Sequence, residues 1–176
     1  MTAFSFETMV QDLRACVGSP DPQAAIRLYL ERLVQYPAAP LLTASEQLSD
    51  PETLFFEDAD LSIWHCRFQP GTMMPPHEHL LPVFIACYAG EEKSVLFQTN
   101  DSGLEHIGDL SAHAGDVILL DQDAIHAVTA NGDRPSEAIH VYLGPLMTLK
   151  RDLFDWESGD AVPFTLDAFE SMKRPA

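Results

Sequence analysis

Two histidines two positions apart, His77 and His79, are the residues of this chain whose type and spacing point most directly to chemistry. On an extended strand, side chains at positions i and i+2 lie on the same face, about 7 Å apart along the chain. Two imidazoles placed in this way can bind one metal ion from a rigid sheet. Because neutral imidazole suits zinc, iron, copper and nickel alike, the pair predicts a metal site without choosing the metal.

Glycines flank this pair at regular distances. Five residues separate Gly71 from His77, Gly90 follows His79 by eleven positions, and a later segment holds a glycine eleven positions before His126. These two segments resemble the two sequence motifs of the cupin superfamily. The resemblance implies a mainly β fold, the double-stranded β-helix or jelly-roll barrel, with His126 as the third metal ligand.

The chain departs from the cupin motifs at the carboxylate ligand. Val83 stands where cupins with four protein ligands carry a glutamate. The second motif reads Asp121, Asp123 and Ala130 in place of its proline, glycine and asparagine. Three neutral imidazoles would leave the charge of a divalent ion uncompensated, with coordination positions open to a substrate and O2. Such a site favours anionic or thiolate ligands, and it resembles the three-histidine non-heme iron centres of thiol dioxygenases.

A late stretch of the chain extends this resemblance. Proteins similar to cysteine dioxygenase carry Ser-x-His-x-Tyr on a late strand, and here Ala138, His140 and Tyr142 stand at those positions. The resemblance covers residues 60–157 and implies that Tyr142, oriented by His140, is a catalytic hydrogen-bonding group beside the iron. Considered alone, His140 is better explained as a hydrogen-bonded core histidine, and Tyr142 is also explained as a core aromatic residue.

Other positions limit which substrate the resemblance implies. Eukaryotic cysteine dioxygenases crosslink a cysteine to the tyrosine, but Phe84 stands at that position, so no thioether is expected. Those enzymes also hold the substrate carboxylate with an arginine on an early strand, whereas no Lys or Arg stands between Arg32 and Arg67. Free cysteine is therefore not the expected substrate. Arg67 shares its strand parity with His65 and is the candidate for binding a substrate carboxylate, if its side chain points inward.

Three functions follow from these residues. The first is an iron-dependent dioxygenase, an oxidoreductase that holds Fe(II) and oxidises a small thiol or another anionic metabolite with O2. Nickel, zinc, copper and manganese also tolerate imidazole and stay open. The second is a lyase or isomerase in which the ion acts as a Lewis acid and the tyrosine as a base. The third is a non-catalytic protein whose metal site binds a ligand without turnover.

The rest of the chain predicts the elements that must position these residues. Residues 5–17 and 22–34 carry apolar side chains at helical spacing, and Asp21-Pro22 and Tyr36-Pro37 are expected to start and stop the second helix. From residue 53 onward, period-two patterns and turn residues predict about nine short strands in an antiparallel sandwich or barrel. These strands are expected at 53–56, 61–68, 73–79, 82–89, 93–99, 104–108, 116–120, 125–130 and 137–144.

A chain of 176 residues fits one domain. We expect a single domain over residues 1–176, made of a helical segment at 1–40, a β-barrel at 53–145 and a packing tail at 146–176. Within the tail, Phe154, Trp156 and Phe164 are expected to pack over the barrel.

The net charge of −17 repels phosphate backbones and anionic lipid, so neither nucleic acid nor a membrane is an expected partner. Three scattered cysteines and the lack of a signal segment or long apolar run favour the cytoplasm. The cupin resemblance implies a possible homodimer that pairs through sheet edges.

The remaining candidates have simpler interpretations. We interpret His65, His106 and His113 as structural or solvent-facing, Cys66 and Cys87 as small buried residues, and Glu91 and Glu92 as a solvated turn.

Overall fold

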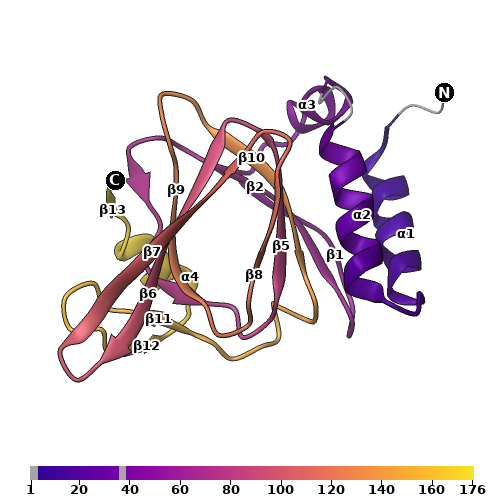
Figure 1. Ribbon diagram of the computed structural model, residues 1–176. Helices are drawn as coiled ribbons and strands as arrows, with labels where there is room; N and C mark the ends of the chain where they lie inside the picture. Colours follow the sequence, from indigo (N-terminus) through magenta and orange to yellow (C-terminus); the bar gives the residue numbers. More distant parts are fainter. Residues whose placement is uncertain (1–3, 36–38) are drawn as a thin grey trace.

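The computed structural model describes residues 4–35 and 39–176, so Tyr36-Pro37, the expected end of the second helix, lies outside the described residues. Two antiparallel sheets face each other and enclose a barrel, with helices against one side (Figure 1). The five-stranded sheet has the order β1-β2-β10-β5-β8, and the six-stranded sheet has the order β12-β11-β4-β9-β6-β7. Strands distant in the sequence are therefore neighbours in space. This arrangement is the mainly β double-stranded β-helix that the sequence predicts.

The strand bounds follow. The five-stranded sheet contains β1 (Glu52–Glu57), β2 (Ser62–Phe68), β10 (Ser136–Tyr142), β5 (Val83–Ala89) and β8 (Val117–Leu120). The six-stranded sheet contains β12 (Ala161–Pro163), β11 (Asp152–Phe154), β4 (His77–Glu78), β9 (Ile125–Ala130), β6 (Glu91–Asn100) and β7 (Gly103–His113). A separate pair joins β3 (Thr72–Met73) to β13 (Arg174–Pro175).

The strand expected at 73–79 is instead divided into β3 and β4. Pro75 and Pro76 separate the two short strands, and proline has no N–H with which to continue a ladder. This division leaves His77 at the start of β4, where it pairs with β9.

Two helices, α1 (Phe6–Val17) and α2 (Pro22–Gln35), form as the periodicity predicts and pack against the outer face of the five-stranded sheet. The hydroxyl of Ser5 accepts a hydrogen bond from the Thr8 amide at the start of α1, and the Asp21 carboxylate does the same for Ala24 in α2. A third helix, α3 (Ala39–Ser45), was not expected, because seven residues are too few to show a helical period.

Alternation along the strands assigns side chains to one of two faces. On β10, Ile139 and Val141 pack with the helices, whereas Ala138 and Tyr142 belong to the cluster inside the barrel. His140 has the same parity as Tyr142 and is likewise inside, 3 % exposed. The central strand β10 therefore carries both predicted catalytic residues on its inner face.

The C-terminal segment packs over one end of the barrel, and it contains regular structure that was not expected there. It contributes β11 next to β4, the strand β12, the short helix α4 (Leu166–Ser171) and β13. Phe169 of α4 is buried in the same cluster as Leu153 of β11, and Phe164 packs against that cluster. Within the described residues, no helix is long and apolar enough to cross a membrane.

Candidate metal centre

The structure brings the three predicted ligands together at one end of the barrel. His77 on β4 and His126 on β9 are directly opposite each other in the antiparallel ladder, and His79 follows β4 by one residue. Their candidate ligand nitrogens all lie within 4.8 Å of one another, and all three residues are buried. Leu80, directly after His79, has a φ of 56°, a left-handed conformation that is strained for a bulky residue. The chain therefore turns sharply once the third imidazole is in place.

Hydrogen bonds orient two of the three rings. Nδ1–H of His77 donates to the carbonyl of Pro75 at 2.8 Å, and Nδ1–H of His126 donates to the hydroxyl of Ser94 at 3.0 Å. These donations leave the Nε2 lone pairs of both rings without a proton. Fixing the tautomer through the distal nitrogen is the usual way in which a protein prepares a histidine for a metal.

The spacing of the nitrogens fits a metal ion. Nε2 of His126 lies 3.4 Å from Nε2 of His79. Two nitrogens that each lie roughly 2.1 Å from one ion, at angles between octahedral and tetrahedral, are about 3 to 3.5 Å apart. The arrangement therefore satisfies the distance requirement without any rearrangement of the two side chains.

The three imidazoles are held in the neutral form that binds metals. Burial lowers the pKa of His77 to about 4, and it lowers those of His79 and His126 well below the ordinary value. The positive charge of Arg151 acts in the same direction on all three. At neutral pH no proton competes with a metal for these lone pairs.

A hydrogen-bonded chain of three buried side chains lies beside this cluster. Nδ1 of His140 is 3.3 Å from the Tyr142 hydroxyl, and Nε2–H of His140 donates to the carboxylate of Glu92 at 3.0 Å. The Tyr142 ring packs edge-on against His79, with centroids 4.9 Å apart. The structure thus places His140 and Tyr142 next to the candidate ligands.

Glu92 was expected in a solvated turn, and this expectation is wrong. The residue is 1 % exposed, because β6 begins at Glu91 and turns its second residue into the barrel. Its second oxygen, Oε1, is buried and has no hydrogen-bond partner among the described residues. Glu92 shares a strand face with Ser94, and that period-two relation was the signal available in the sequence.

The carboxylate of Glu92 affects where the protons lie in the hydrogen-bonded chain that it forms with His140 and Tyr142. Burial disfavours the charged form of His140, but the carboxylate of Glu92, which accepts from Nε2–H, raises the pKa of His140 above the ordinary value. A protonated His140 donates from both ring nitrogens, to Glu92 and to the Tyr142 oxygen. The hydroxyl proton of Tyr142 is then free to point elsewhere, and burial raises the pKa of Tyr142, which keeps that proton in place.

Arg67 does not face this site. It lies on the opposite face of β2, where its guanidinium donates to the carbonyl of Ser45 and to the carboxylate of Glu137. The residues of β2 that line the site have the other parity: Trp64, Cys66 and Phe68. His65, as interpreted, is structural: it is fully buried and contacts Glu137 beside Arg67.

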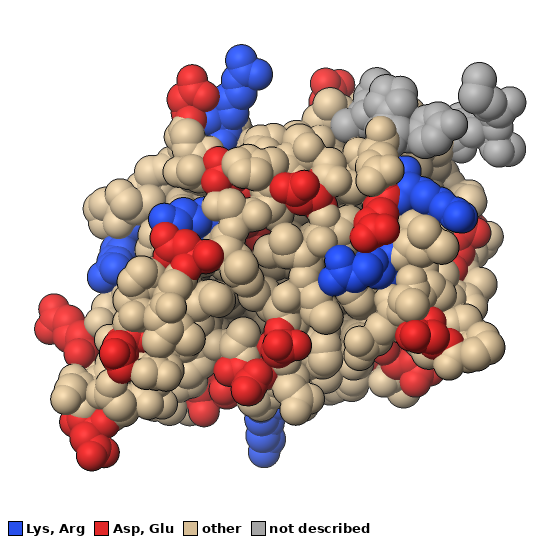
Figure 2. Space-filling model, viewed as in Figure 1, with Lys and Arg blue, Asp and Glu red and all other residues tan. Residues whose placement is uncertain are grey.

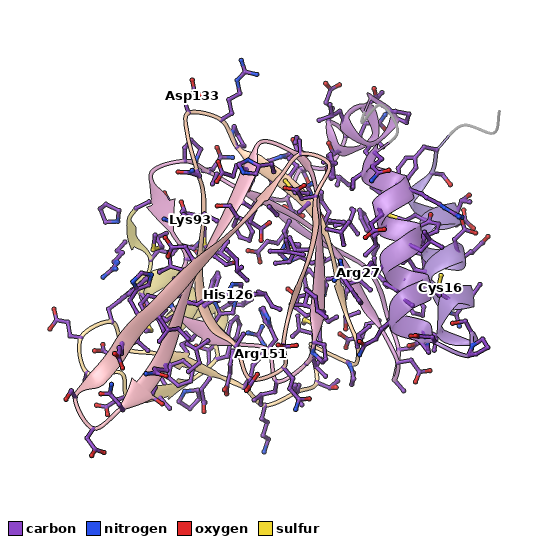
Figure 3. All side chains as sticks on the ribbon, viewed as in Figure 1. Cys16, Arg27, Lys93, His126, Asp133 and Arg151 are labelled. Atoms are coloured by element: carbon purple, nitrogen blue, oxygen red, sulfur yellow. The ribbon has the colours of Figure 1, made fainter. Side chains whose placement is uncertain are left out.

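The arginine that does reach the site is Arg151, which precedes β11 and gave no signal in the sequence. It lines a cavity of about 900 Å³ that opens from the three histidines, and its guanidinium stacks on the Phe164 ring at 3.5 Å. His126 and Arg151 both lie in the space between the two sheets (Figure 3).

The other interpreted residues are where they were expected. Cys66 and Cys87 are buried, and His106 and His113 are exposed on β7. The face shown in Figure 2 has acidic side chains at many separate points and fewer basic ones, in keeping with the net charge.

Comparisons with known proteins found similar solved structures but no similar sequence. No protein-family model and no curated protein matches the sequence. The structure is similar to that of a protein from Bacillus halodurans, with a TM-score of 0.50 and 15% identity over 69% of this chain and 83% of that one. It is also similar to an RmlC-like cupin with a double-stranded β-helix fold from Methanocaldococcus jannaschii (TM-score 0.46, 14% identity, 57% and 87% covered). A third similar structure is oxalate oxidase in complex with glycolate (TM-score 0.42, 16% identity, 56% and 53% covered). By its strand topology, the chain has the double-stranded β-helix fold of the cupins.

Proposed function

We propose that the protein is a non-heme Fe(II) dioxygenase that oxidises a thiol, or another anionic metabolite, with O2. The observation that carries this proposal is the set of three neutral imidazoles directed at one point, with a protonated tyrosine hydroxyl beside them. Three neutral ligands favour an anionic donor from the substrate. Among the described residues, the cluster includes no carboxylate that would neutralise the ion.

Iron bound by His77, His79 and His126 would supply the redox chemistry and the position at which O2 and an anionic donor meet. For a thiol, both oxygen atoms of O2 are added to sulfur, so RSH and O2 give RSO2H without another reductant. The protein's own part is orientation, exclusion of water and control of protons.

Tyr142 is the group of this chain that donates a hydrogen bond to the reacting molecule. His140 donates a hydrogen bond to the Tyr142 oxygen. The hydroxyl proton of Tyr142 therefore points away from His140 and toward the cavity. Glu92 holds His140 from its far side. A positioned donor of this kind contributes typically about 10²-fold or more to a rate.

The test is metal analysis of the protein and of its His126→Ala variant, followed by oxygen consumption after Fe(II) loading with a panel of thiols. We expect near-stoichiometric iron in the wild type, its loss in the variant, and thiol-dependent O2 uptake by the wild type alone. Turnover that persists without O2 would assign a lyase or isomerase instead. Ligand binding without turnover would assign a non-catalytic binding protein, and no bound metal in either protein would overturn the metal site itself.

A further inference from the structure

The cavity beside the histidines is larger than a small thiol requires. Its volume of about 900 Å³ lies near the top of the range of about 300 to 1,000 Å³ that encloses drug-sized ligands. The histidines and Tyr142 occupy only one wall. The space therefore extends well beyond the atoms that would bind at a metal.

The C-terminal segment contributes an apolar wall to the cavity, which begins next to the histidines where Phe169 packs edge-on against His77. Phe164, Leu166 and Phe169 line it, and Met147 lies at the same cavity. Leu166 is 74% exposed and Met147 is 62% exposed, the two highest values among the exposed large hydrophobic residues of the described chain. Exposed apolar side chains that gather at the mouth of a cavity are typical of a ligand-binding surface.

One cation of this cavity has no anionic partner. Within the described part of the chain, no carboxylate oxygen lies within 4 Å of the Arg151 guanidinium, whose contacts are the Phe164 ring and the carbonyl of Glu78 at 3.5 Å. The planar face of the guanidinium is covered by the ring, which leaves N–H groups at its edge. Such an edge binds a carboxylate through two parallel hydrogen bonds.

The other charged residues that line the cavity are Glu52, Asp152 and the exposed Lys150. Burial raises the pKa of Glu52 and so favours its neutral form. Arg151, which stacks on the Phe164 ring inside the cavity, is the cation placed to bind one carboxylate of a ligand.

We propose that the substrate is an amphipathic monocarboxylate, whose carboxylate binds Arg151 and whose apolar body, of medium-chain or aromatic size, lies against Phe164, Leu166 and Phe169. This inference rests on the proposed function in one respect. Besides the carboxylate and the apolar body, the substrate would have a third group, the atom that coordinates the metal ion. The apolar body makes the substrate larger and more apolar than a free amino acid.

Binding of simple acids to metal-free protein tests this subsite independently of the metal. The probes are octanoate, propanoate and 1-octanol, titrated by calorimetry into the full chain after chelation. We expect octanoate to bind at least about tenfold more tightly than propanoate, which lacks the apolar body, and than 1-octanol, which lacks the charge. Equal binding of octanoate and propanoate would overturn the apolar subsite.

Substitutions in the cavity test which side chains contact the carboxylate and which contact the apolar body of the ligand. Arg151→Gln is expected to weaken octanoate at least about tenfold and to leave 1-octanol within about twofold, with Arg134→Gln, an exposed arginine outside the cavity, as the matched control. Leu166→Asn changes a side chain that is 74% exposed, and is expected to weaken octanoate and 1-octanol alike. Unchanged octanoate binding in Arg151→Gln would overturn the anion subsite, and Arg151→Lys, which keeps the charge, is expected to retain part of the affinity.

The two proposals fail separately. A protein that binds octanoate through Arg151 but holds no metal keeps this subsite and rejects the dioxygenase. A protein that holds iron and takes up O2, but binds octanoate no better than propanoate, keeps the dioxygenase and rejects the subsite.

Discussion

A buried carboxylate that pairs with a single histidine is an unusual feature, and Glu92 is such a residue. Removing a carboxylate and an imidazole from water is costly, and a hydrophobic pair of similar volume is often as stable. The pair is therefore more readily explained by what it does to His140 and Tyr142 than by stability alone. The sequence identified His140 and Tyr142 as candidate catalytic residues, but it did not identify Glu92, the acid that accepts a hydrogen bond from His140.

Glu92→Gln keeps the shape of the side chain and removes its charge. We expect the pKa of His140 to fall toward its ordinary value, because the nearest full negative charge is lost, and NMR titration of the imidazole measures this. The free energy of unfolding should decrease by about 2 kcal/mol, since a buried charged partner is lost. Glu91→Gln, one residue away and partly exposed, is the control, and an equal effect from both variants would contradict the role of Glu92.

Tyr142→Phe removes only the hydroxyl. We expect turnover to fall by about 10²-fold with metal content unchanged, because the hydroxyl donates to the reacting molecule and does not ligate the ion. Metal analysis and steady-state kinetics on the same preparation measure both quantities. Full turnover in every assay would show that the tyrosine is only a core residue.

Among the elements, β6 supports both halves of the site. Glu92 and Ser94 are two positions apart, so their side chains point to the same inner face, where one contacts His140 and the other His126. Neither touches a metal position directly. A single strand thus orients a ligand and the hydrogen-bonding chain together, and a shift of its register by one residue would remove both contacts.

Ser94→Ala tests this support on the metal side. Loss of the acceptor for Nδ1–H of His126 should weaken metal affinity by about 10- to 100-fold, with little change in the fold. Competition with a chelator of known affinity measures it. Thr99→Ala, an exposed position on the same strand, provides the comparison, and identical affinities in the two variants would show that Ser94 does not orient the ring.

For the whole molecule, a second buried polar cluster joins the barrel to its helical layer. Glu137 on β10 accepts hydrogen bonds from Tyr88 at 2.9 Å and from Arg67 at 3.3 Å, and it contacts His65. Arg67 also donates to the carbonyl of Ser45 at the end of α3. Arg67, which the sequence analysis considered for substrate binding, therefore connects the barrel to the helical layer.

This cluster predicts acid sensitivity. Burial would raise the pKa of Glu137, but the hydrogen bonds that it accepts lower its pKa to about 2. Since the folded-state pKa lies below that of the unfolded chain, the carboxylate stabilises the fold fully above about pH 4.5, and this contribution is lost as the pH falls toward 2. Urea unfolding should show a difference of about 2 kcal/mol between wild type and Glu137→Gln at pH 7, and a shrinking difference below pH 4.5. A difference that does not change with pH would contradict the assignment.

The sequence by itself determined the mainly β fold class, the two helices that pack on the sheet, and the pair His77 and His79, because period-two and helical patterns are local. His126 was named as the third ligand by the resemblance to the second cupin motif, and the structure brings it to the pair through the pairing of β4 with β9. The assignment of Arg67 failed because strand parity relates neighbours to each other but does not say which face meets the helices and which meets the cavity. Only the tertiary structure decided that Glu92 crosses from β6 to His140 on the facing sheet, and that Arg151 reaches the histidines from the C-terminal segment. These contacts depend on how the two sheets close and on where an irregular segment packs, and neither leaves a local pattern in the chain.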